Sequence, residues 1–200
     1  WAVATEGSGN IRIQGGASPQ RSGSVAISSG QSASQDGAGQ NDKGYMSIST
    51  GSSEAGSSGE LKIDTGAAAS RSGSVTLASG EAHGTSGSIQ MSSGDSVEGN
   101  SGSLNLAAGL SSAGLGGDVL IHAGDGNKGG NVILRSGVGS DMGGTIRVQA
   151  GSSGTSSGGA ISIESGLSRG QSSGDVKISS AGGSSESGKV SLATGAASGG

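Results

Sequence analysis

The sequence predicts an all-β protein, and three observations support this prediction. A pair of apolar residues separated by one other residue recurs thirteen times along the 200-residue chain. A glycine stands two positions before every pair, and another follows three positions after nearly every pair. The alternation of apolar with small or polar residues has a period of two, which is typical of a strand, whereas a helix needs apolar residues three and four positions apart.

Each pair is expected to be the centre of a short strand, and the segments between pairs are expected to be turns. Successive pairs lie 13 to 15 residues apart, apart from a 21-residue step that contains a long loop at residues 30–44. The intervening segments are rich in Gly, Ser, Asn and Asp, and their glycines are expected to supply positive φ angles. In chain order the pairs are Ile11/Ile13, Val25/Ile27, Met46/Ile48, Leu61/Ile63, Val75/Leu77, Ile89/Met91, Leu104/Leu106, Val119/Ile121, Val132/Leu134, Ile146/Val148, Ile161/Ile163, Val176/Ile178 and Val190/Leu192.

Short repeated strands without crossover helices predict a β-solenoid, in which strands stack about 4.8 Å apart on their equivalents. The segments between pairs carry no regular apolar position, so we expect two repeats per coil, each about 14–15 residues long, with two sheets facing each other. An antiparallel β-sandwich with a meandering chain is the alternative. Residues 1–200 are expected to form a single tandem-repeat β domain of 13 repeats. Because the last repeat is ordinary and would leave an unpaired edge, we expect a longer array or filament.

Composition limits the function classes. The chain has 45 glycines, one proline, no cysteine and a net charge of -4. High glycine and serine content alone is also typical of a disordered linker, against which the regular apolar pairs argue. The charges are scattered singly, so there is no basic stripe for nucleic acid, and no apolar run approaches the roughly 18 residues of a membrane span.

No catalytic, cofactor-binding or metal-binding residue is predicted, and we expect no enzymatic activity. The sequence has no nucleophile elbow, no phosphate-binding loop and no metal motif. Asp125 and Asn127 resemble part of a calcium loop, but the acidic residues do not recur at a fixed place in each repeat. His83 and His122 have no companion histidine at ligand spacing, and we expect both to be surface residues.

Two neighbouring repeats depart from the pattern. The residue between the two members of a pair is mostly polar, but it is Leu120 in "GGDVLIHAG" and Ile133 in "GGNVILRSG". Two interpretations stay open. The two side chains pack locally under a loop, or they form a lateral contact with another subunit, since exposed apolar patches mark interaction sites.

The repeats "SGSVTLASG", "GGDVLIHAG", "GGTIRVQAG" and "SGDVKISSAG" resemble the Gly/Ser-rich tandem repeats of extracellular structural proteins of stramenopile algae. This group includes builders of tubular flagellar hairs and other surface filaments. The resemblance extends over the whole chain and implies a secreted structural role, a β-rich rod and glycosylation. The sequence has no Asn-x-Ser/Thr acceptor, so any glycan would be O-linked, on hydroxyl-rich loops such as "SSEAGSSG".

These observations predict a structural subunit of an extracellular fibre or cell-surface appendage. We expect it to associate with itself or with other filament proteins through β-stacking and lateral contacts. An ice-binding or other ligand-binding solenoid is one alternative, although the outward positions Arg12, Ala26 and Ser47 differ too much for a lattice match. An adhesin-like stalk that carries a binding module elsewhere is the other.

Overall fold

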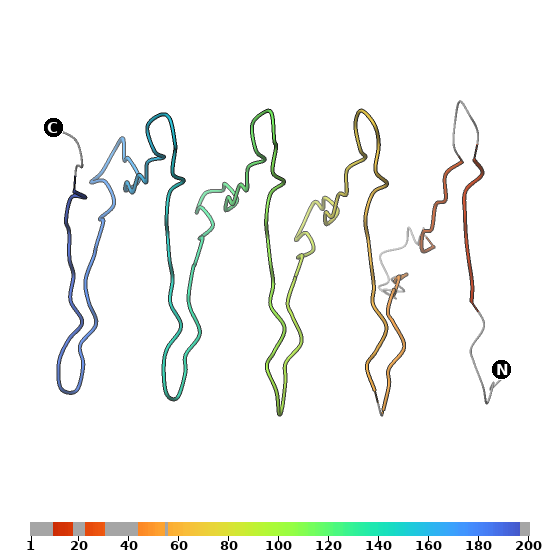
Figure 1. The fold of residues 1–200 in the computed structure, drawn as a ribbon, viewed down its shortest axis with the longest axis horizontal. Helices are drawn as coiled ribbons and strands as arrows, with labels where there is room; N and C mark the ends of the chain where they lie inside the picture. The colour runs from red at the N-terminus through yellow and green to blue at the C-terminus, as the bar shows by residue number, and fades with distance from the viewer. Residues whose placement is uncertain (1–9, 18–22, 31–43, 55, 197–200) are drawn as a thin grey trace. The chain divides into compact units, whose positions relative to one another are not determined.

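The computed structural model describes residues 10–17, 23–30, 44–54 and 56–196, and within them there is no helix and no strand. The chain divides into a first unit, Trp1–Ser93, and a second unit, Gly94–Gly200. In each unit the apolar pairs lie in extended runs, and the chain reverses direction in loops between runs (Figure 1). Most of the long loop predicted at residues 30–44 lies outside the described residues. The single tandem-repeat domain stays a prediction.

The predicted β-solenoid is wrong for this chain, and so is the antiparallel β-sandwich. Both folds need ladders of backbone hydrogen bonds and a buried core. In the described part of the chain, backbone hydrogen bonds occur at the reversals and do not continue along the runs, and no residue is buried. Each repeat supplies only two large apolar side chains, while ordering a glycine-rich backbone has a high entropic cost. Two side chains per repeat do not hold neighbouring runs together.

The period-two alternation is nevertheless present as extended backbone. The Lys62 Nζ atom lies 3.1 Å from Asp64 Oδ2, and the Ser162 hydroxyl donates a 3.0 Å hydrogen bond to Glu164 Oε1. In both cases the two polar residues flank the second apolar residue of a pair. Side chains two positions apart meet only when they lie on the same side of an extended chain. The polar residues therefore lie on one side of each of these runs.

Hydrogen bonds between two glycines close six of the described reversals. In each of these six, the amide of the glycine two positions before one pair donates to the carbonyl of the glycine that follows the preceding pair. The bracketing glycines are thus the two ends of these reversals. The donor and acceptor residues are Gly23 and Gly16 (2.7 Å), Gly117 and Gly109 (2.9 Å), Gly130 and Gly124 (2.9 Å), Gly144 and Gly137 (3.0 Å), Gly159 and Gly151 (2.9 Å), and Gly174 and Gly166 (3.1 Å).

Close approach of neighbouring atoms, rather than positive φ, explains why glycine begins several of the runs. The expected positive φ angles are absent from the described glycines for which the surrounding space is known. A Cβ atom added at Gly130 would lie 3.3 Å from the Cβ of Ala123, and one at Gly144 would lie 3.2 Å from the Cβ of Ser136. Ala123 and Ser136 are among the few residues that are partly buried. Packing in this chain is therefore concentrated at the reversals.

Serine side chains order several of the same loops. In each case the serine stands two positions after the glycine that follows a pair, and its hydroxyl oxygen accepts a hydrogen bond from the amide three residues later. This local bond competes well with regular structure in turns. The acceptor and donor residues are Ser96 and Gly99 (3.0 Å), Ser111 and Gly114 (2.9 Å), Ser153 and Ser156 (2.9 Å), and Ser168 and Gln171 (2.9 Å).

Neighbouring glycines in one loop provide a test of this account. Replacing Gly130 with alanine is expected to open the bond to Gly124, because the added Cβ meets Ala123. Loss of a hydrogen bond of about 1 kcal/mol should speed exchange of the residue 130 amide about fivefold, as measured by NMR. Gly129→Ala is the control, since a Cβ there meets no atom within 4 Å. Equal exchange rates in the two variants would contradict the close-approach explanation.

Candidate functional site

The exposed apolar pairs are the main chemical feature of the described residues. Every described Val, Ile, Leu and Met is at least 47% exposed, the lowest value being that of Val190. Monomeric soluble proteins rarely leave so much regularly placed apolar surface in water. Because the pairs recur along the chain, this surface forms a series of similar apolar sites, one on each run. Exposed apolar surface of this kind is a common mark of a contact site for another macromolecule.

Leu120 and Ile133, the two predicted contact residues, lie on consecutive runs of the second unit. They are 70% and 76% exposed, so neither is packed beneath a loop. The loop between the two runs is closed by the hydrogen bond between Gly130 and Gly124. Leu120 and Ile133 therefore lie on two consecutive runs that are joined by this one loop. Their role in lateral contact stays a prediction.

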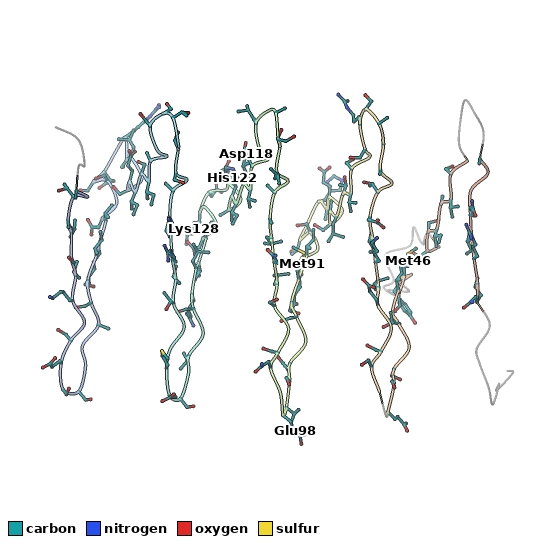
Figure 2. All side chains as sticks on the ribbon, viewed as in Figure 1. Met46, Met91, Glu98, Asp118, His122 and Lys128 are labelled. Atoms are coloured by element: carbon teal, nitrogen blue, oxygen red, sulfur yellow. The ribbon has the colours of Figure 1, made fainter. Side chains whose placement is uncertain are left out.

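Polar and charged residues bound these two apolar segments. Asp118 and His122 flank the first segment, residues 119–121, and both extend from its run in Figure 2. Asn131 and Arg135 flank the second segment, residues 132–134. All four flanking residues are exposed. No ion pair joins Asp118 to Arg135, although the structure describes both residues.

Apolar residues in the loops were not identified from the sequence as candidate contact residues. They are Val97, Leu110, Leu115, Val138, Met142 and Leu167, which are 81% to 100% exposed. The signal that marks them is an isolated apolar residue in a Gly/Ser-rich loop, outside the register of the pairs. They add apolar surface at the reversals, next to the surface that the runs present.

A hollow among the described residues does not form a built site for a small ligand. It is open, has a volume of about 290 Å³, and is lined by Glu81, Ala82 and His83, which are consecutive residues of one loop. No second element brings a further polar group to it. Within the ranges that the structure describes, no three His, Asp or Glu residues are grouped so as to hold a metal ion. The same ranges contain no helix that is long and apolar enough to cross a membrane.

Comparison of this chain with protein-family models, with curated proteins and with solved structures finds no match.

Proposed function

We propose that this protein is a structural subunit of an extracellular fibre or cell-surface appendage, in which copies of the chain cover one another's apolar pairs. The observation that carries the proposal is the exposure of every described pair, with no core in the same residues. Burial of apolar surface is the main favourable contribution to protein association. The apolar side chains of the described pairs are exposed, so a second chain can bury them.

Repetition favours a second copy of the chain as the partner. Pairs spaced 13 to 15 residues apart match the spacing of another identical chain over many runs at once. The backbone amides and carbonyls along the described runs have no backbone partner among the residues that the structure describes. Extended segments with unpaired backbone groups readily pair with other chains. Apolar contact and backbone pairing between copies therefore act together.

The loops support an extracellular setting. They are rich in exposed hydroxyl groups, and Ser152 and Ser157 flank the turn acceptor Ser153 in one of them. We propose that such hydroxyls carry O-linked glycans in the assembled fibre. Sugars at the reversals would leave the runs free for contact between copies. These 200 residues contain no cysteine, so the contacts that they make between copies involve no disulfide.

Self-assembly of the purified chain tests the proposal. We expect a concentration-dependent change from single chains to filaments of uniform width, measured by sedimentation velocity and by cryo-electron microscopy of the same samples. Uniform width distinguishes a built fibre from amorphous aggregation, which exposed apolar residues also promote. Single chains at every concentration, or shapeless aggregates alone, would contradict the proposal.

A further inference from the structure

We propose that residues 118–122 and 131–135 form a self-complementary docking surface for a second copy of the chain. Residues 118–122 of one copy pack antiparallel against residues 131–135 of the other, and the reverse contact forms at the same time. This inference deepens the proposed function and rests on it, because it specifies one lateral contact of the fibre.

The composition of the two runs distinguishes them from the others. In the other repeats the residue between the two members of a pair is polar or is alanine, as at Arg147 and Ser162. Here it is Leu120 or Ile133, so these runs carry large apolar side chains on both sides of the extended backbone. One side is equivalent to the apolar side of every other run. The additional side is the surface available for a lateral contact.

A two-fold axis makes both contacts compatible. The Gly130 amide donates to the Gly124 carbonyl, so the two runs of one copy leave the loop between them from neighbouring points. A two-fold axis directed along the difference between the two run directions places each run of one copy antiparallel to the other run of its partner. Both contacts are then antiparallel, which is the condition for an isologous interface.

Charge complementarity selects this arrangement. Antiparallel alignment of residues 118–122 with residues 131–135 places Asp118 of one copy opposite Arg135 of the other, and His122 opposite Asn131. A parallel alignment would place His122 opposite Arg135 and leave Asp118 without a cation. Neither Asp118 nor Arg135 forms an ion pair with the other within its own chain. The two-fold arrangement forms the Asp118 to Arg135 pair twice.

Charge-reversal variants test the docking surface. In Asp118→Arg each interface contains two Arg–Arg contacts, and in Arg135→Asp it contains two Asp–Asp contacts. We expect each variant alone to dimerise about tenfold more weakly than the original chain, as estimated from surface charge pairs. An equimolar mixture of the two variants restores both oppositely charged pairs and should restore the original affinity. Dimers are quantified by crosslinking of differently tagged chains at concentrations below filament formation.

Matched controls come from the loop between the runs. Asp125→Arg and Lys128→Asp change the same charges outside the docking surface, and we expect neither variant, nor their mixture, to alter dimerisation. A second test replaces Leu120 and Ile133 with serine, which should weaken the dimer without a change of charge. Unchanged dimerisation in the serine variant overturns the proposal, as does a charge-reversal mixture that dimerises no better than its components.

The two proposals fail in different ways. If filaments form equally well from the original chain and from the serine variant, the proposed docking surface is contradicted but the proposed fibre is not. If mixing the two charge-reversal variants restores dimerisation but no filaments form at any concentration, the docking surface is supported and the proposed fibre is contradicted.

Discussion

Replacing Ile146, Val148, Ile161 and Ile163 with serine is expected to weaken self-assembly about a thousandfold. These side chains are 52% to 70% exposed in the single chain, so assembly can bury about half of each. Full burial of such a side chain contributes roughly 1.5 to 3 kcal/mol, so half contributes about 1 kcal/mol. Four of them give about 4 kcal/mol, or roughly a thousandfold in the association constant. The measurement is the concentration at which filaments appear, followed by light scattering.

A matched control changes the polar positions of the same two runs. Arg147→Ser and Ser162→Thr leave both apolar pairs intact, and we expect their combined effect on the filament threshold to be less than about tenfold. If the polar variant shifts the threshold as much as the apolar variant does, apolar burial is not the driving force.

The second large effect concerns unfolding. In dilute solution, below the assembly threshold, the chain is expected to show no cooperative unfolding transition in calorimetry or in urea titration. Cooperative unfolding and its positive heat-capacity change both require apolar surface that the native state buries. No described residue is buried in the single chain. Above the threshold, the assembled chain should show a heat-absorbing transition whose midpoint rises with protein concentration.

The serine variant of the four paired residues sharpens this test. In dilute solution it should behave like the original chain, because the substitution removes no core. A sigmoidal transition that is independent of concentration in the original chain, and lost in the variant, would show that the pairs are buried within one chain.

The extended runs and their reversals are predictable from the sequence. The alternation around Ile63 and Ile163 indicates extended backbone, and the polar contacts on either side of these residues agree with it. The bracketing glycines also locate the reversals, since Gly124 and Gly130 are the acceptor and donor of the closing hydrogen bond. The extended runs and the reversals each depend on residues that are close together in the sequence, so the alternation and the bracketing glycines are enough to predict them.

The pairing of the runs is not predictable in the same way. The sequence of a run does not show whether its apolar residues pack against a run of the same chain or of another chain. The predicted solenoid assumed packing within the same chain. A glycine pattern is similarly ambiguous, because positive φ and close approach both require glycine. The absence of positive φ and the short distances at Gly130 and Gly144 separate the two causes here.

The candidate contact residues were predictable in part. Leu120 and Ile133 interrupt a regular polar position, so they are visible in the sequence, and the structure places them in exposed positions on consecutive runs. Leu110 and Leu115 were missed because an isolated apolar residue in a loop has no periodicity to mark it. The pairing of Asp118 with Arg135 belongs to the proposed contact between two copies, and it stays a prediction.

The single hydrogen bond that closes six of the described reversals also has a mechanical consequence. In one of them the Gly130 amide nitrogen lies 2.9 Å from the Gly124 carbonyl oxygen, whereas the same segment pulled straight spans roughly 20 Å. Opening that bond releases this length without rupture of a core or of a ladder. A tether of such reversals lengthens in small steps at low force and shortens again when the load is removed. Outside the contacts between copies, the chain is thus suited to act as an extensible spacer.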